Sequence, residues 1–159
     1  LGRLETYLGE WERWAAELLE SHISYPVLGY FRSQHANQSW LSALGVMLDA
    51  SAVLVAGAED GCMRQARLTF AIARHAIVDL AQLYLRRLPA SIPNRLPPED
   101  RDLLLRGLQQ AGLAWNWDEA YVQRLNALRQ LYEPHLCAMA ARLRLEAPRR
   151  LGVSHALDN

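Results

Sequence analysis

Four histidines carry the most versatile chemistry in this chain. Together with nearby acids they could bind a metal ion, because imidazole and carboxylate groups are common metal ligands. The residues of this candidate site are His22, His35, His75 and His135 with Glu20, Asp79 and Glu133. His75 and Asp79 are four residues apart and would share one face of a helix. The Glu-x-x-His pair of many helical metal sites is missing, so hydrogen-bonded structural histidines are the favoured interpretation.

A polar and aromatic stretch, ESHISYPVLGYFRSQHANQSW, covers residues 20–40. Many of its side chains combine an apolar body with a hydrogen-bonding tip, as is common at interfaces and functional clefts. Three interpretations remain open: a structural junction between helices, which is favoured, a contact site for a partner or small ligand, and a catalytic cleft. The residues predicted to build this junction or sensing cluster are Glu20, His22, Tyr25, Arg32, His35, Gln38 and Trp40.

Motifs of the common enzyme classes are missing from the sequence. It contains no HExxH, GxSxG, GxGxxG or paired CxxC motif. All 17 basic residues are arginine, which excludes a Schiff-base lysine and a P-loop lysine. Cys62 and Cys137 are far apart in the sequence and suit a reducing compartment, as buried free thiols. We therefore assign no catalytic residue and no cofactor from these motifs.

The composition indicates one globular domain without a role in nucleic-acid binding. Of the 159 residues, 51% are hydrophobic and 21% are charged, and the formal net charge is zero. The charges are unevenly placed: residues 1–20 hold five Glu and two Arg, whereas residues 64–87 hold five Arg and one Asp. Residues 142–150 are also basic. Opposite patches of this kind favour docking between helices or subunits.

An apolar seam with alternating spacings of three and four residues runs through the N-terminal segment. Its members are Leu1, Leu4, Leu8, Trp11, Ala15, Leu18 and His22. This heptad-like spacing predicts an entry helix over residues 1–22. Because the seam is already present at Leu1, we expect the helix to continue from an upstream segment. The side chains predicted to pack against a neighbouring helix in an oligomer are Leu4, Leu8, Trp11 and Leu18.

Residues 40–57 form an apolar stretch with a single charged residue, Asp49. The stretch has the length of a short membrane span, but a central Asp costs about 2.5–3.5 kcal/mol on insertion scales. A buried core helix is therefore the favoured interpretation. A buried carboxylate needs a partner, and we expect an arginine from the helix predicted over residues 61–87.

Helical periodicity also describes the rest of the chain. A short helix is expected after Pro26, over residues 27–34, and Ser39 and Asp118 are expected to cap the helices that follow them. Residues 88–98 hold four prolines and predict a loop, and Pro134 should interrupt the last long helix. No strand pattern is present. The sequence thus predicts an all-α fold: a single bundle of about five helices over residues 1–147, followed by a flexible tail at 148–159.

Two parts of the chain resemble a known family. Residues 1–56, from LGRLETYLGEWERW to LDASAVLVA, resemble the region after the pore in bacterial two-transmembrane, potassium-channel-type proteins. Tyr132-Glu133-Pro134, flanked by Leu128 and Leu136, resembles a motif near the end of the cytoplasmic helical domain of that family. The basic sequence Ala147-Pro148-Arg149-Arg150 departs from the apolar, proline-containing end expected there. No TVGYG-like filter is present, so no conduction residue is assigned.

The resemblance implies a non-enzymatic regulatory or assembly domain of an ion channel at the cytoplasmic face of the bacterial inner membrane. Such a domain would be joined to an upstream transmembrane pore domain of the same chain and would form a homo-oligomer, because pores of this type are fourfold. Two alternatives remain. One is a soluble helical module that senses a small ligand in a cavity lined by His22, His35 and His75. The other is a metal-dependent helical-bundle enzyme.

Overall fold

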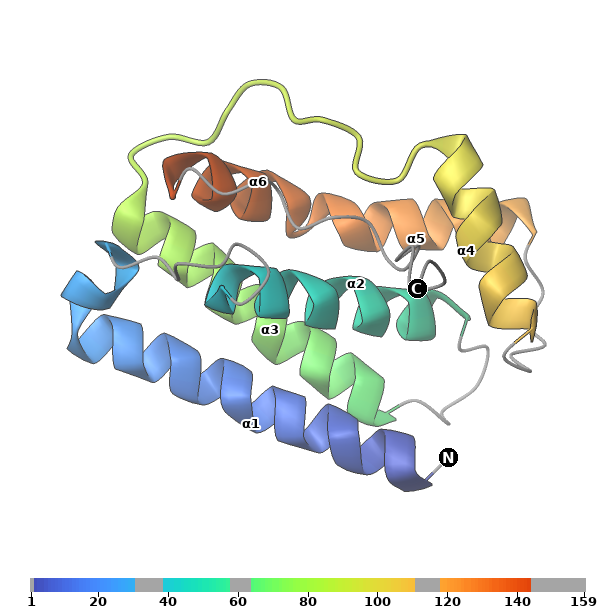
Figure 1. Ribbon diagram of the computed structural model, residues 1–159, viewed down its shortest axis with the longest axis horizontal. Helices are drawn as coiled ribbons and strands as arrows, with labels where there is room; N and C mark the ends of the chain where they lie inside the picture. Colours follow the sequence, from blue (N-terminus) through green and yellow to red (C-terminus); the bar gives the residue numbers. More distant parts are fainter. Residues whose placement is uncertain (1, 31–38, 58–63, 111–117, 144–159) are drawn as a thin grey trace, which may run out of the picture.

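The computed structural model describes residues 2–30, 39–57, 64–110 and 118–143, and every regular element in these residues is helical (Figure 1). This confirms the predicted all-α bundle, with six α-helices and one short 3-10 helix in the described part. The elements are α1 (Gly2–Ser24), η1 (Pro26–Tyr30), α2 (Trp40–Gly57), α3 (Arg64–Tyr84), α4 (Pro98–Gln110), α5 (Glu119–Gln130) and α6 (Glu133–Arg142). The predicted tail at 148–159 lies outside the described residues.

Helix α2 is the central element of the bundle. It contacts α3, α5 and α6, and 67% of it is buried. By length and composition alone, α2 is the one described helix that could cross a membrane. Its burial among the other helices confirms the predicted core helix. Leu41, Leu44 and Leu48 have no exposed surface, and the buried Asp49 lies on the same helix.

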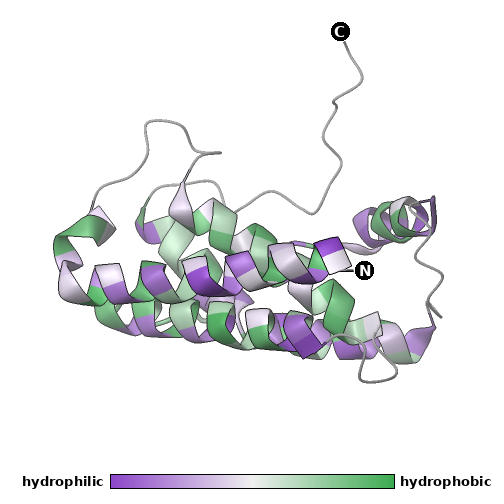
Figure 2. Cartoon of the chain, turned by 90° about the horizontal axis from the view of Figure 1, so that it is seen from below, coloured by the Kyte–Doolittle hydropathy of each residue, from purple (hydrophilic) through white to green (hydrophobic). Residues whose placement is uncertain are grey.

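Helix α1 packs along α3 (Figure 1), and the residues that it buries belong to its apolar seam. Leu8, Ala15 and His22, seven residues apart, are its buried residues. Polar contacts add to this packing, because the Thr69 hydroxyl donates to the carbonyl of Leu8 (2.8 Å). In Figure 2 hydrophilic and hydrophobic residues alternate along the helix ribbons, as amphipathic helices require.

The helix ends follow their capping residues. The Ser42 amide donates to Ser39 Oγ (3.0 Å), and the Tyr121 amide donates to Asp118 Oδ1 (2.8 Å), which confirms both predicted N-caps. Pro134 lacks an amide hydrogen, and the helix is interrupted just before it: α5 ends at Gln130 and α6 begins at Glu133. The two helices then continue in nearly the same direction (Figure 1).

A long loop connects α3 to α4 and passes over the bundle (Figure 1). This loop was predicted from the prolines of residues 88–98, and α4 starts at the last of them, Pro98. Helix α4 has no buried residue, and Leu104, Leu105 and Leu108 are only partly buried against the core. One side chain of this loop, Arg95, is buried and enters the bundle.

We expect Asp118→Ala to lower the free energy of unfolding by about 1 kcal/mol, because an N-cap acceptor is lost. Chemical denaturation monitored by circular dichroism measures this change. Glu119→Ala, one position later, is the matched control, since Glu119 is exposed and bonds only Gln123 on its own helix. Equal effects of the two substitutions would contradict the capping role.

Candidate functional site

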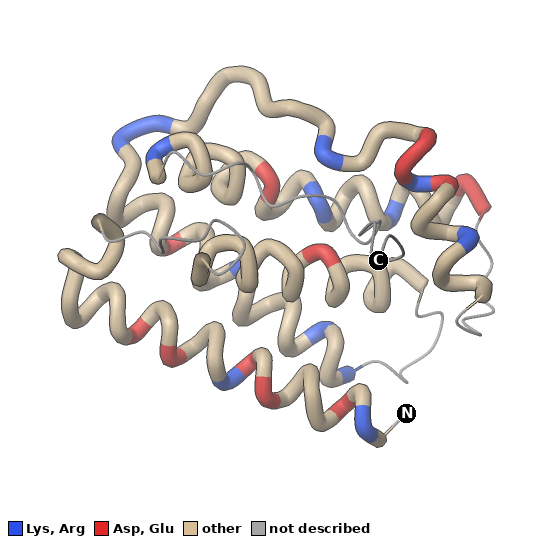
Figure 3. The backbone as a smooth tube through the Cα atoms, viewed as in Figure 1, with Lys and Arg blue, Asp and Glu red and all other residues tan. Residues whose placement is uncertain are grey.

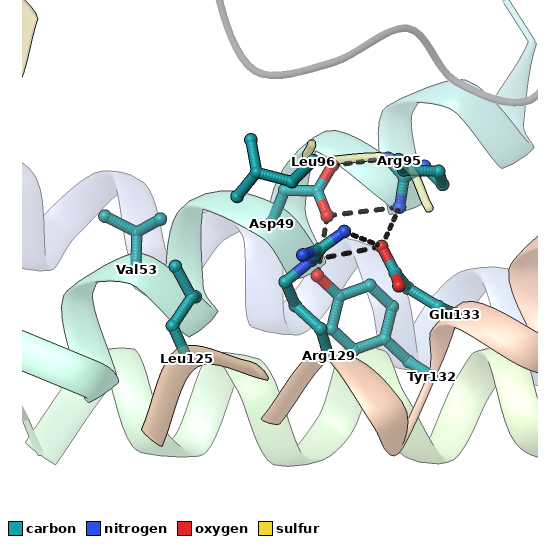
Figure 4. Close-up of a pocket in the computed structure, with 8 residues that line it drawn as sticks. All are labelled: Asp49, Val53, Arg95, Leu96, Leu125, Arg129, Tyr132 and Glu133. Atoms are coloured by element: carbon teal, nitrogen blue, oxygen red, sulfur yellow. Dashed lines mark hydrogen bonds and ion pairs between the residues drawn. The ribbon is translucent and has the colours of Figure 1, made fainter. Parts of the chain in front are cut away.

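Five buried polar residues from three parts of the chain form a single cluster (Figure 4). We call it the buried charge cluster; its members are Asp49, Arg95, Arg129, Tyr132 and Glu133. Arg95 Nη2 lies 2.6 Å from Asp49 Oδ2 and Nη1 lies 3.3 Å from Oδ1, so the guanidinium binds the carboxylate with both nitrogens. The Tyr132 hydroxyl donates to Asp49 Oδ1 at 2.6 Å. Both carboxylate oxygens of Asp49 therefore accept hydrogen bonds.

Glu133 forms the second half of the cluster. Arg129 Nη2 and Nε donate to Glu133 Oε1 at 2.6 and 3.1 Å. Arg95 Nη1 lies 3.5 Å from the same oxygen and thus links the two carboxylates. Two arginines balance two acids, so the cluster has no formal net charge. This balance matters because removing one partner of a buried pair typically costs about 3–5 kcal/mol.

Local chain geometry places each of these side chains. Asn94 Oδ1 accepts a hydrogen bond from the Leu96 amide (3.0 Å), which holds the loop in a tight turn around Arg95. The helix break before Pro134 places Tyr132 and Glu133 at the start of α6. The carboxylate of Glu133 is there close to the positive end of the α6 dipole.

The prediction that Asp49 has a charged partner is confirmed, but the partner was expected from the wrong element. An arginine of the helix over residues 61–87 was expected, whereas the partner comes from the loop that follows. Arg64, Arg67 and Arg74 of α3 are exposed, because they lie outside the buried stripe of that helix. A signal for Arg95 was present: it is the one charged residue in the otherwise apolar and proline-rich segment 88–98.

Burial and pairing both act on the ionisable groups in and around the cluster. Burial acts to lower the pKa of Arg95, but the neighbouring carboxylate of Asp49 outweighs it and the pKa is raised. Burial, together with the charge of Asp49, raises the pKa of Tyr132. Burial likewise raises the pKa of the Cys137 thiol. At neutral pH the arginine is thus charged, while the phenol and the thiol are protonated.

The cavity beside the cluster has a volume of only about 10 Å³. This is about the space of one water molecule, and Val53, Leu96 and Leu125 close its apolar side (Figure 4). The cluster joins α2, the loop and α6 through these hydrogen bonds and ion pairs.

A second group of polar and aromatic side chains lies at the end of α1. The rings of His22 and Trp40 are 4.9 Å apart, and Tyr84 lies edge-on to His22 at 6.4 Å. His22 Nδ1 bonds the carbonyl of Leu18 (2.8 Å), and its buried Nε2 has no hydrogen-bond partner among the described residues. Two predicted junction residues, His22 and Trp40, are thus brought together, with Tyr84 as a partner that the sequence pattern did not indicate.

The other predicted junction residues do not join this group. Glu20 and Tyr25 are exposed. Arg32, His35 and Gln38 lie outside the described residues. Arg142 instead completes the group from α6, with its guanidinium carbon 5.1 Å from the centre of the Tyr30 ring and 5.9 Å from that of Tyr84. A sensing role for these residues stays a prediction.

The side chains predicted to pack in an oligomer lie largely within the chain's own fold. Leu8 is only 2% exposed and packs with Leu54 and Ala66. Leu4, Trp11 and Leu18 are partly buried against the same chain. Their role in an oligomer stays a prediction, and Trp11 retains access to an open groove.

The histidines in the described part of the chain are in three different surroundings. His22 is buried beside Trp40, whereas His75 is exposed on α3 with Nε2 3.3 Å from Asp79. His135 lies beside α3 residues, and burial lowers its pKa. Among the described residues, no three His, Cys, Asp or Glu side chains are grouped as metal ligands would be.

Comparisons with known proteins found no matching family model, no matching curated protein and no matching solved structure. The interpretation of this chain therefore depends on its own residues and their geometry.

We expect Arg95→Met to lower the free energy of unfolding by about 3–5 kcal/mol, because two buried carboxylates lose their shared cation. In the double variant Asp49→Asn/Arg95→Met the loss should be clearly smaller than the sum of the single losses. Urea denaturation of the four proteins in the cycle measures this coupling.

Arg87→Met is the matched control, since Arg87 lies exposed in the same loop. A loss below about 1 kcal/mol for Arg95→Met, in the range of exposed ion pairs, would show that the cluster contributes little to stability.

We expect Gly29→Ala to lower the free energy of unfolding by about 1–3 kcal/mol, because a Cβ atom at this position of η1 would overlap the ring of Tyr84. Thermal unfolding measures the loss. Gly107→Ala is the control, since a Cβ at Gly107 meets no atom within 4 Å and should stabilise exposed α4 slightly. A Gly29→Ala variant as stable as the parent would contradict the packing of Tyr84 on η1.

Proposed function

We propose that this chain is a cytoplasmic regulatory or assembly domain of a bacterial potassium-type ion channel and that it has no enzymatic activity. It would act at the cytoplasmic face of the inner membrane, joined through α1 to a pore domain of the same chain, and it would form a homo-oligomer. The starting point is the resemblance of residues 1–56 and of Tyr132-Glu133-Pro134 to that family.

One observation carries the proposal: the two stretches with this resemblance meet in the buried charge cluster. Asp49 belongs to the first stretch and Tyr132 and Glu133 to the second, and the hydroxyl of Tyr132 bonds Asp49 at 2.6 Å. A motif more than 80 residues away thus has a physical role in the same folding unit. This supports one domain built from both stretches rather than two unrelated similarities.

The closed state of the cluster supports a non-catalytic role. Its acids are paired and hydrogen-bonded, and the adjoining space is about 10 Å³. Catalytic acids and bases need access to a reacting group within hydrogen-bond reach. The most chemically equipped part of the described chain lacks that access and instead fastens three segments to one another.

The geometry of α1 supports mechanical coupling to a pore. A helix of 23 residues is about 34 Å long. Its buried seam and the hydrogen bond from Thr69 to the Leu8 carbonyl tie it to α3. A rotation or displacement of the bundle would therefore move the N-terminal end of α1, and in the proposed channel this end continues into the pore helix.

The ligand-sensing alternative has less support from the geometry. It predicted a polar cavity lined by three histidines, but His22 and His75 occur in different surroundings and His35 lies outside the described residues. The metal-dependent enzyme would need a group of ligands, and none occurs in the described ranges.

The decisive experiment uses the complete gene. We expect the coding sequence upstream of Leu1 to encode two membrane helices with a filter-like loop, and the full-length protein to conduct K⁺ when reconstituted in liposomes. Deleting the chain from Leu1 onward, and separately Arg95→Met, should lower the K⁺ flux per protein. Arg87→Met is the control. A gene without membrane segments before Leu1, or a full-length protein without K⁺ flux, would contradict the proposal.

A further inference from the structure

An open apolar groove of about 550 Å³ lies between α1 and α2. Its walls are the side chains of Trp11, Trp14, Ala43, Val46 and Met47, and Glu10 stands at its rim. Val46 is 46% exposed, although it belongs to the most apolar helix of the bundle. Exposed apolar surface next to two tryptophans is typical of a binding surface.

The α1 side of the groove continues beyond these residues. Tyr7, which is 52% exposed, lies one turn before Trp11 and two turns before Trp14 on the same face. Glu17 is seven residues after Glu10 and therefore repeats the acidic rim two turns later. Figure 3 shows acidic residues along the length of α1. The groove is thus aromatic inside and acidic along its edge.

Helix α3 carries a surface of the opposite kind. Arg67 and Arg74 are exposed and seven residues apart, which is the spacing of Glu10 and Glu17. Leu68, which is 40% exposed, and the exposed Ala71 lie between them in the sequence and to one side of them on the helix surface. None of these arginines forms an ion pair with another described residue. This α3 row therefore combines exposed apolar side chains with positive charge.

We propose that the groove binds the α3 row of a second copy of this chain. The acids at Glu10 and Glu17 would face Arg67 and Arg74, while Leu68 would enter the groove beside Trp14 and Val46. The match in sign and in spacing selects a second copy over other partners, because opposite potentials on matching surfaces align two chains. The two surfaces belong to the segments that differ in charge: residues 1–20 are rich in Glu, and residues 64–87 are rich in Arg.

The pairing is head-to-tail, because the groove and the α3 row are different surfaces. The row consists of exposed residues of α3, whereas the groove lies between α1 and α2. Contacts of this type form a ring when the rotation between copies closes. The pairing does not depend on the proposed function. A ring of four copies around a pore does depend on the proposed function.

The test measures self-association of the chain by sedimentation velocity, up to about 1 mM, the effective concentration that a short tether gives. We expect concentration-dependent oligomers that weaken as salt is raised. Glu10→Arg/Glu17→Arg should weaken association at least about tenfold, and so should Arg67→Glu/Arg74→Glu, because each places like charges opposite one another. An equimolar mixture of the two variants should associate again, since each then meets an oppositely charged face.

The control mixture has the same net charges elsewhere on the molecule: Glu99→Arg/Asp102→Arg with Arg86→Glu/Arg87→Glu. Each of these two control variants, measured alone, should associate like the parent. An uncharged pair, Val46→Ser and Leu68→Ser, should each weaken association through lost apolar contact. Because all these positions are exposed, the variants are expected to fold, which thermal unfolding verifies.

Three results would overturn the proposed pairing. They are a parent chain that stays monomeric over this range, a reversed mixture that associates no better than its components, and a control mixture that gains as much as the reversed one. A monomeric chain within a conducting full-length protein would reject these surfaces and leave the channel proposal in place. Self-association without K⁺ flux in the full-length protein would do the opposite.

Discussion

The buried carboxylate of Asp49 is the constraint on which the rest of this bundle depends. A core helix with one charged residue cannot be packed on all sides by apolar side chains, because an uncompensated buried charge is costly. The compensation comes from Arg95 in a loop and from Tyr132 at the start of α6. The path of the long loop brings Arg95 to this carboxylate, and the helix break before Pro134 places Tyr132 beside it.

The cluster pairs two buried acids with arginines from different parts of the fold. Arg95 serves Asp49 and Glu133 together, and Arg129 completes the balance for Glu133. In the loop from α3 to α4, Arg95 is buried, and Leu85 and Leu96 pack partly buried against the core. A chain that uses buried ions in this way gains a defined arrangement of α2, α5 and α6, because other registers of these helices would leave charges unpaired.

The apolar seam of α1 has two uses in the structure. Leu8 and Ala15 face α3 and the core, whereas Trp11, together with Trp14 beside the seam, borders the groove next to α2. A heptad-like pattern therefore does not by itself identify a partner helix in another chain. Here the partner of the seam is mostly α3 of the same chain, and the surface available to a second copy lies beside the seam. In the proposed pairing, folding and assembly therefore use largely different residues of one helix.

The sequence alone determined the helical class, the buried position of residues 40–57, the caps at Ser39 and Asp118 and the break before Pro134. These features depend on periodicity, hydrogen-bonding side chains and the missing proline amide, which act over a few residues. The need of Asp49 for a cation was also readable, because burial follows from the surrounding apolar sequence. Only the tertiary structure decided that Arg95 meets this need, that His22 meets Trp40 and Tyr84, and that Leu8 is used inside the chain. Such contacts join residues far apart in sequence. The packing of the helices decides which of them form, and local sequence patterns carry no information on that packing.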